Sequence, residues 1–219
     1  ETDLEEPKKV AEAVKKLNLK YVVITSVTRD DLEDGGASIY AQTVKEIKNS
    51  TNCAVELLIP DFKIRDSKIL KEGYLNSDAL KTVIDSKPDV LAHNIEAVRR
   101  VFQKVRAGGN YDVSLELLRK AKEINPNLKT KSSIILGFDE TKEEIIGTMQ
   151  DLRKNKVDFL TLGQYLQPSL KHVKISKYYK PKEFEEFKKI GKQMGFRHVE
   201  AGPLVRSSYR ADKLNVLIK

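Results

Sequence analysis

Cysteine is almost absent from this sequence: Cys53 is the only one among 219 residues. A single cysteine cannot form a disulfide within the chain, which is typical of reducing compartments such as the cytoplasm, or the mitochondrion of a eukaryote. It also excludes a zinc or iron–sulfur site whose cysteine ligands all come from this sequence. Because Cys53 directly precedes a predicted strand, we interpret it as a structural residue.

Long apolar runs are also missing. No window holds the roughly 18 apolar residues that a membrane-spanning helix needs, so we expect no membrane association. The first seven residues, ETDLEEP, are acidic and lack the apolar core of a signal peptide. They also lack an initiator methionine, so we expect the chain to be a fragment or a trimmed product.

Acidic residues are in the minority: the sequence has 40 lysines and arginines but only 32 aspartates and glutamates, which gives a net charge of +8. The lysines are mostly interleaved with acids, which favours a solvated, heavily charged surface. A basic face for an acidic protein partner is the second interpretation. Nucleic acid is disfavoured, because no Arg/Lys stripe is interleaved with aromatic residues.

What the sequence does contain is a regular alternation of apolar segments and helical patterns. Predicted strands begin near residues 21, 54, 90, 131, 159 and 198. Between them, and ahead of the first strand, apolar residues recur at helical spacing. The helices are predicted at 7–18, around 40–47, at 76–84, at 98–105, from 115 to before Pro126, at 141–152 and around 184–187. This alternation predicts parallel βα units, as an open doubly wound sheet or an incomplete β/α barrel in one domain. A Rossmann fold is disfavoured, because no GxGxxG follows the first strand.

Local signals mark several helix starts. Ser77 is a candidate cap, and Thr141 with Glu144 forms a capping box. The loop 25–37 follows the first strand with three hydroxyls, an arginine and four acids, and it closes on Gly-Gly. Such a loop is typical of the ligand-binding mouth of an α/β sheet or barrel. The simpler interpretation is a solvated acidic turn with Asp34 as a helix cap.

Polar side chains collect at the carboxyl ends of the predicted strands, which converge on one face of a β/α barrel. They are Thr25, Ser26, Asp61, His93, Asn94, Glu96, Gln164 and Tyr165, with Gly137, Gly163 and Gly202. Some have a simpler interpretation: His93 as a structural histidine, Asn94 as a helix cap with Glu96 in the first turn, and Gln164 as a partner of the backbone. Lys131 either points outward from its strand or, if buried in a barrel, suggests Schiff-base chemistry.

The segment 202–209, Gly-Pro-Leu-Val-Arg-Ser-Ser-Tyr, places two serines between an arginine and a tyrosine. A plain turn is the simpler interpretation. No Ser-His-Asp set is evident, which disfavours a hydrolase.

Eight groups of residues carry a family resemblance, and they run over nearly the whole chain. They are 25–27 with 29–32 and 34–37; 58–62; 93–96; 105–106 with 111 and 114–115; 130–132; 151–153; 160–166; and 202–209. In this order they resemble the lipoyl synthases of the radical S-adenosylmethionine (SAM) superfamily. The GQYL and RSSY segments are the most distinctive.

The resemblance implies an α/β fold, the incomplete (β/α)6-type TIM barrel of radical SAM enzymes, with two [4Fe–4S] clusters. One cluster cleaves SAM to a 5′-deoxyadenosyl radical, which abstracts hydrogen from C6 and C8 of a protein-bound octanoyl chain. The auxiliary cluster supplies the two sulfur atoms. Unactivated C–H bonds need such a radical cofactor because they have no acidic proton. The implied partners are octanoylated lipoyl carrier domains (2-oxoacid dehydrogenase E2 and the glycine cleavage H protein) and an electron donor such as ferredoxin or flavodoxin.

The resemblance also implies roles for particular residues. Ser208 matches the serine ligand of the auxiliary cluster, with Ser207 as the alternative, and Arg206 would position their loop. The residues that match expected SAM contacts are Thr25, Ser26, Asp30, Asn94, Glu96, Arg106, Lys131, Ser132 and Gln164. An acidic Glu96 or Asp30 suits the cationic part of SAM, and Arg106 suits its carboxylate.

The chain also departs from the family pattern. Both cysteine motifs of the family are absent, so we expect residues 1–219 to be one truncated partial-barrel domain. Its first strand and cluster loop would be missing, and it would be inactive alone. Smaller departures are Ile39, where a histidine is common, and 137–140. Two alternatives stay open: a Schiff-base barrel enzyme using Lys131, and a cluster-free module that binds lipoyl carrier domains.

Overall fold

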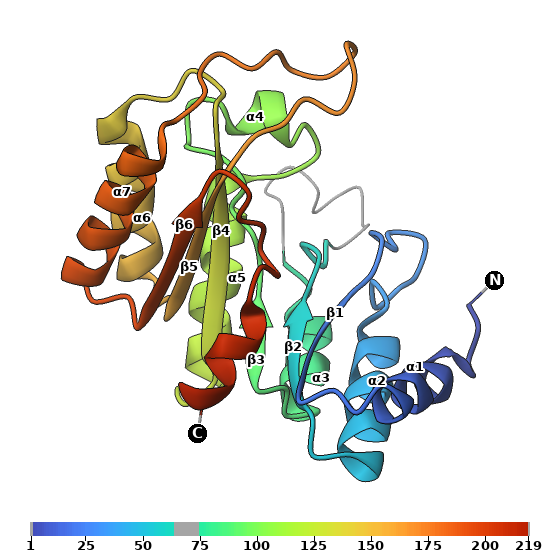
Figure 1. Cartoon of the computed structure of the whole chain (residues 1–219). Coiled ribbons are helices and arrows are strands. Elements are labelled where there is room, and N and C mark those ends of the chain that lie inside the picture. Colours follow the sequence, from blue (N-terminus) through green and yellow to red (C-terminus); the bar gives the residue numbers. More distant parts are fainter. Residues whose placement is uncertain (1, 64–74, 219) are drawn as a thin grey trace. The chain divides into compact units, whose positions relative to one another are not determined.

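The computed structural model describes residues 2–63 and 75–218. The chain forms two compact units, which are described separately. Unit 1 comprises residues 1–92, 120–129 and 210–219, and unit 2 comprises residues 93–119 and 130–209. Figure 1 shows helices and strands alternating along the chain in both units.

Unit 1 is a three-stranded parallel sheet with its helices. The helices are α1 (Glu6–Lys16), α2 (Ala37–Ser50) and α3 (Ser77–Asp85), with a 3₁₀ helix η2 (Ala211–Val216). The strands β1 (Tyr21–Thr25), β2 (Ala54–Leu58) and β3 (Val90–Ala92) follow their order in the chain. Tyr21 pairs with Ala54 and Glu56 with Val90, both in parallel register.

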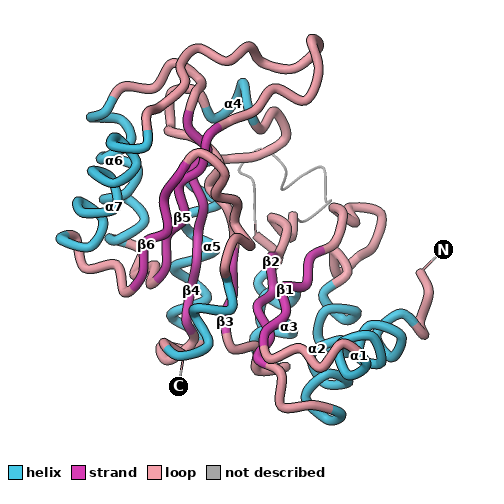
Figure 2. Tube along the Cα trace, viewed as in Figure 1, coloured by secondary structure: helices cyan, strands magenta, loops and turns pink. Residues whose placement is uncertain are grey.

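Unit 2 repeats this arrangement with longer strands, which Figure 2 draws in magenta. Its strands are β4 (Lys129–Leu136), β5 (Phe159–Gln164) and β6 (His198–Gly202). Its helices are α4 (Phe102–Val105), α5 (Tyr111–Ile124, ending in unit 1), α6 (Lys142–Lys154) and α7 (Pro181–Gln193). Lys131 pairs with Phe159, and Phe159 in turn with His198, again in parallel.

Buried apolar runs explain why these segments become strands. All residues of β5 are buried, as expected for a parallel strand covered on both faces. On one face of unit 2, Ile134 and Leu160 pack in a core with Met149 of α6 and Phe184 of α7. Because side chains alternate along a strand, the odd-numbered positions of β4 and β5 lie on the other face.

The predicted strands and most predicted helices are confirmed. The Thr141–Glu144 capping box of α6 is present in full. The start of α3 is a correction: Asn76 rather than Ser77 is the cap, and its side chain accepts a hydrogen bond from the Ala79 amide at 3.0 Å.

The segment after β3 is the second correction. A helix was expected over 98–105, but only Phe102–Val105 is α-helical. No helix follows Asn94 directly, so its predicted role as a helix cap is wrong. The physical reason is that Glu96 adopts a left-handed conformation, with φ at 66°, and bridges Ile134 of β4 in parallel. The chain therefore extends alongside the sheet before it turns.

Candidate functional site

The carboxyl end of β1 in unit 1 opens on a cavity of about 520 Å³. Thr25 and Ser26 line it together with Arg29 and Tyr40. The Tyr40 hydroxyl donates to the Leu58 carbonyl at 3.0 Å and accepts a hydrogen bond from the Ser26 amide at 2.9 Å. It thereby fixes the chain just after β1, with the Ser26 Oγ 3.0 Å away.

The acids of the loop after β1 have separate roles. Asp31 forms a two-pronged ion pair with Arg29, whereas Asp30 is exposed and does not line the cavity. Asp34 accepts hydrogen bonds from the amides of Gly36 and Ser38 at the start of α2. Partial burial acts to raise the pKa of Asp34, but these hydrogen bonds outweigh it and lower the pKa below its ordinary value. The cap position of α2 is Gly36, so the prediction of Asp34 as the helix cap is wrong; Asp34 stabilises the helix start from two residues earlier.

In unit 2, residues 93–96 run alongside β4. The Glu96 amide donates to the Ser133 carbonyl at 3.0 Å, and the Ile135 amide donates to the Glu96 carbonyl at 2.8 Å. The Ser132 hydroxyl accepts a hydrogen bond from the Ile95 amide at 3.1 Å. Ser132 therefore holds the backbone of this segment in place.

Three of the predicted site residues meet here, and we call Asn94, Glu96 and Arg106 the unit 2 cluster. The Arg106 guanidinium donates to the backbone carbonyl of Asn94 at 3.1 Å and to the Ser114 hydroxyl at 3.2 Å. Burial raises the pKa of the Glu96 carboxyl, while a hydrogen bond from Asn94 and the charge of Arg106 oppose that shift.

The cluster also holds an unused acceptor. The Asn94 side-chain oxygen is buried and has no hydrogen-bond partner among the described residues. Such an atom is costly to leave unpaired, so it favours a ligand that donates a hydrogen bond. Together, the desolvated Glu96 carboxylate, the Arg106 guanidinium and the open side-chain oxygen of Asn94 suit a ligand that carries both an amine and a carboxylate.

Lys131 and Ser132 do not share a site. They are neighbours on β4, so their side chains lie on opposite faces of the sheet. Ser132 shares the face of Ile134, which packs under the helices, and Lys131 lies on the other face. Lys131 is only 2% exposed, so the outward-pointing interpretation is wrong.

Gln164 lies at the carboxyl end of β5, where it pairs with Leu136. It is four register positions, or about 13 Å, beyond the level of Ser132. Its amide nitrogen donates to the carbonyls of Tyr165 and Lys177, and its oxygen accepts from the Tyr179 amide at 2.9 Å. The interpretation that Gln164 bonds the backbone is confirmed; a contact with SAM stays a prediction.

The RSSY segment forms a turn after β6. The Tyr209 amide donates to the Arg206 carbonyl at 2.9 Å, which leaves Ser207 and Ser208 at the crest. Arg206 donates to the carbonyls of Gln164 and Val205, so it does position this loop. Ser208 is exposed and Ser207 half-buried.

The described residues do not fit an iron–sulfur cluster. They contain no group of three or more His, Cys, Asp or Glu side chains able to hold a metal ion. Cys53 is buried just before the amino end of β2, away from the strand ends where the candidate residues lie. Burial also raises the pKa of its thiol, which disfavours a thiolate ligand.

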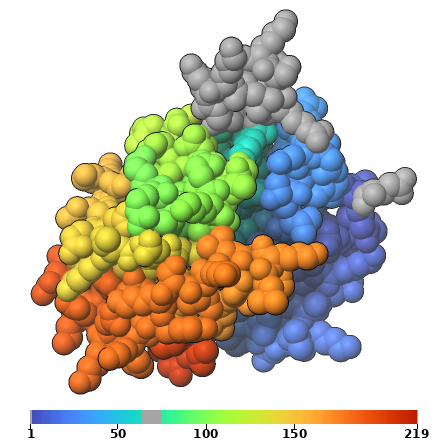
Figure 3. Space-filling view, turned by 90° about the horizontal axis from the view of Figure 1, so that it is seen from above, coloured from blue at the N-terminus to red at the C-terminus, as the bar shows by residue number. Residues whose placement is uncertain are grey.

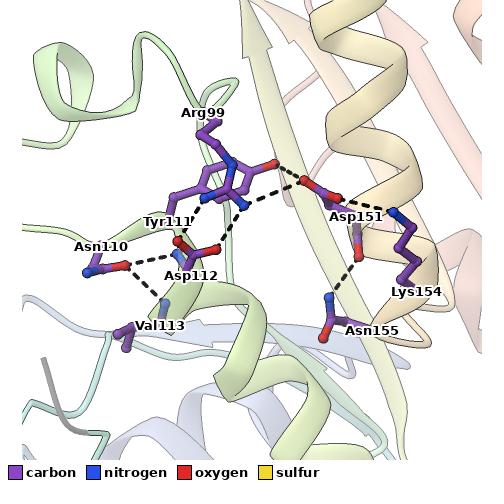
Figure 4. Close-up of polar contacts among 8 residues, drawn as sticks. All are labelled: Arg99, Asn110, Tyr111, Asp112, Val113, Asp151, Lys154 and Asn155. Carbon is purple, nitrogen blue, oxygen red and sulfur yellow. Dashed lines mark hydrogen bonds and ion pairs between the residues drawn. The ribbon is translucent and has the colours of Figure 1, made fainter. Parts of the chain in front are cut away.

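Sequence reasoning missed a polar network that joins α5 to α6. Figure 4 shows the Arg99 guanidinium over the Tyr111 ring, paired with the Asp112 carboxylate, while the Tyr111 hydroxyl points at Asp151. The Tyr111 hydroxyl lies 3.1 Å from the Asp151 carboxylate. Tyr111 and Asp151 belong to the resemblance segments, but their contact spans 40 residues and leaves no local signal.

Comparisons with known proteins place these features in a family. A family model for the radical SAM superfamily matches residues 1–152. The lipoyl synthase of Bacillus subtilis (strain 168) is 54% identical over 214 residues, which are 97% of this chain and 68% of that protein. The chain belongs to the lipoyl synthase family of the radical SAM superfamily.

A second lipoyl synthase, from Shouchella clausii (strain KSM-K16), is 52% identical over 97% of this chain and 66% of its own length. The chain thus spans about two thirds of the length of the curated relatives it matches. The superfamily implies SAM and an iron–sulfur cluster as cofactors. None of the described helices is long and apolar enough to cross a bilayer.

A solved structure confirms the fold class. Coproporphyrinogen III oxidase (HemN) from Escherichia coli, a radical SAM enzyme, matches 88% of this chain and 45% of its own, with a TM-score of 0.60 and 15% identity. The six parallel strands are therefore those of a partial, TIM-barrel-like α/β fold. The assignment of residues 1–219 to one domain stays a prediction.

Proposed function

We propose that the complete protein is a lipoyl synthase, which inserts two sulfur atoms at C6 and C8 of an octanoyl chain held by a carrier protein. The observation that carries this proposal is the 54% identity to the Bacillus subtilis lipoyl synthase over 97% of the chain. The unit 2 cluster supports it, because its groups suit the amino-acid end of SAM.

In this proposal SAM, when bound, supplies the radical chemistry that unactivated C–H bonds require. The residues of this chain bind and orient it. Glu96 would hold the cationic amine or sulfonium, and its desolvation strengthens that attraction. Arg106 would bind the carboxylate, and the open side-chain oxygen of Asn94 would accept a hydrogen bond. That Thr25, Ser26, Asp30, Lys131, Ser132 and Gln164 also contact SAM stays a prediction from the resemblance.

We further propose two [4Fe–4S] clusters for the complete protein, with their cysteines supplied by residues outside these 219. The two clusters are what the resemblance implies, and the misfit of the described residues and the greater length of the relatives support placing their cysteines outside these residues. Ser208 is the proposed ligand to the auxiliary cluster, and its exposed place on the RSSY turn leaves it accessible. A Ser208→Ala variant should lose one cluster's iron, whereas Ser207→Ala should keep it; the reverse result would assign Ser207.

The proposed partners are octanoylated lipoyl carrier domains, namely those of 2-oxoacid dehydrogenase E2 and the glycine cleavage H protein. A ferredoxin or flavodoxin is the proposed electron donor. We propose the cytoplasm, or the mitochondrion of a eukaryote, as the place of this reaction.

The decisive experiment uses the full-length protein prepared without oxygen. With SAM, a reductant and an octanoyl-lysyl peptide, it should produce 5′-deoxyadenosine and a lipoylated peptide. The absence of both products from a protein that holds its iron and sulfide would refute the proposal.

SAM binding is tested separately by titration calorimetry. Glu96→Gln should weaken SAM binding about tenfold or more, because it removes a charge-assisted contact. The matched control Glu185→Gln alters an exposed acid on α7 and should leave the affinity unchanged. Equal affinities for the two variants would remove Glu96 from the SAM site.

A further inference from the structure

One exposed connection in unit 2 is unusual in its composition. Residues 166–180, which we call the strap, connect β5 to α7 and contain four lysines and no acid. Figures 1 and 3 show this connection in orange, running out from the strand end and along the molecular surface. Lys171 and Lys174 are exposed and form no ion pair with any described residue.

The strap also exposes large apolar side chains among its lysines. Leu170 is 94% exposed, Tyr178 66% and Leu166 47%. Exposed apolar groups next to unpaired charges of one sign are typical of a surface that meets a partner of the opposite charge.

The base of the strap is fixed to the strand ends. The Ser176 amide donates to the Gly137 carbonyl at 2.8 Å, and the Gln164 side chain bonds Lys177 and Tyr179. A side chain at position 137 would meet the Gln164 amide nitrogen at 2.5 Å, so glycine is needed for this close approach. The side-chain amide of Gln164, hydrogen-bonded through both its nitrogen and its oxygen, therefore anchors the strap.

The tip of the strap is folded rather than extended. The His172 amide donates to the Ser169 carbonyl at 3.0 Å, and the Gln167 side chain donates to the His172 carbonyl at 3.0 Å. Val173 packs against the core of unit 2. Because these contacts fix the backbone that carries the lysines, less conformational entropy would be lost when a partner binds.

The strap also begins close to the unit 2 cluster. The Tyr165 amide donates to the Leu136 carbonyl at 2.7 Å, and Glu96 bridges Ile134, two residues earlier on β4. The base of the strap thus lies about 7 Å along the strand from Glu96. A macromolecule bound to the strap would therefore lie beside the unit 2 cluster, where we propose that SAM binds.

We propose that the strap is the docking surface for the acidic face of a folded carrier domain, contacting the domain itself rather than its acylated lysine. This proposal rests on the proposed function. It assigns to one loop the attraction for an acidic protein that the net charge of +8 suggests. Lys171 and Lys174 supply the charge contacts, and Leu170 supplies an apolar contact that salt does not screen.

The test compares two double charge reversals in the full-length protein. Lys171→Glu/Lys174→Glu alters the strap, and Lys189→Glu/Lys192→Glu alters two exposed lysines with the same spacing on α7. The probe is a fluorescently labelled octanoylated H-protein carrier, and binding is followed by anisotropy at several salt concentrations. The same proteins are assayed for 5′-deoxyadenosine with a short octanoyl-lysyl peptide.

The strap reversal should raise Kd for the carrier about tenfold or more and flatten its salt dependence, because two attractive contacts become repulsive. It should leave the rate with the peptide unchanged, which also shows that the variant is folded. The α7 reversal should keep Kd within about twofold. Leu170→Ser should weaken binding equally at low and high salt.

Three results with the variants would overturn the proposal: an unchanged Kd for the strap reversal, an equal loss in the α7 reversal, or an equal loss with the short peptide. An equal loss in the α7 reversal would assign the effect to overall charge. An equal loss with the short peptide would assign it to the site where SAM and the octanoyl chain bind. Equal competition by nucleic acid and by an acidic protein would indicate a general polyanion surface and would also contradict it. Failure of the proposed function is distinguishable, because the wild type would then make no lipoyl product while carrier binding could still be measured.

Discussion

Replacing Gly163 by alanine should destabilise unit 2, because the backbone of another segment occupies the space that a side chain would need. A Cβ at position 163 would lie 2.0 Å from the Val205 carbonyl oxygen and 3.0 Å from its carbon. Ordinary contact begins at 3.4 Å, so the oxygen would have to move by about 1.4 Å, from 2.0 to 3.4 Å. Neither neighbour is a flexible side-chain end that could rotate away.

The cost can be estimated from the contacts that this movement breaks. Overpacking against a backbone costs about 1–3 kcal/mol. The Val205 oxygen also accepts a hydrogen bond from Arg206, which donates to the Gln164 carbonyl as well, and losing such contacts adds about 1 kcal/mol. We therefore expect Gly163→Ala to reduce the free energy of unfolding by about 2–4 kcal/mol.

Gly147 provides a matched control on α6. A Cβ there would meet nothing within 4 Å, and alanine is the better helix former. Gly147→Ala should therefore stabilise the protein by about 0.5–1 kcal/mol.

The assay is urea unfolding followed by far-UV circular dichroism, with hydrogen exchange at the Val205 and Tyr209 amides as a local readout. Gly163→Ala should lower the urea midpoint and speed exchange at both amides, which are hydrogen-bonded in the turn region. A midpoint equal to that of the wild type, with unchanged exchange, would refute the reasoning. A fall in the midpoint of Gly147→Ala would show that the estimate of free space is wrong.

Three further predictions concern the helix caps, the unit 2 cluster and the polar network. Asn76→Ala should cost about 1 kcal/mol in urea unfolding and Ser77→Ala much less, because only Asn76 caps α3; equal losses would contradict this. Glu96→Gln should be more stable than the wild type at about pH 8, with the difference vanishing below about pH 4, since a raised folded-state pKa means that stability is lost as pH rises through it. A wild type that is the more stable at about pH 8 would reverse the sign of the inferred shift. Tyr111→Phe should lower stability by about 1 kcal/mol through loss of the Asp151 contact, and a neutral result in the same unfolding assay would show that the contact contributes nothing.

Much of the architecture could be predicted because its signals are local. The capping box at Thr141 and Glu144 involves residues three apart, and strands such as Tyr21–Thr25 are short runs of mostly apolar neighbours. These patterns depend on hydrogen bonds and periodicities within one or two helical turns. The resemblance segments added the family and the names of the site residues.

The errors lie where a local signal competed with a distant partner. Residues 98–101 have a helical apolar pattern, but the pairing of Glu96 with β4 keeps the preceding chain extended. Ser77 is a good capping residue by type, yet Asn76 holds the capping geometry.

The sequence by itself determined the alternation of strands and helices, the shortage of cysteine and the family of this chain. The tertiary structure decided which polar groups meet. It brought the Arg106 guanidinium to the Asn94 backbone carbonyl and within electrostatic reach of Glu96, placed Lys131 and Ser132 on opposite faces, and used Gln164 to anchor the strap. The physical reason is that burial and pairing depend on segments far apart in the chain, such as Gly163 and Val205, whose contact no window of the sequence contains.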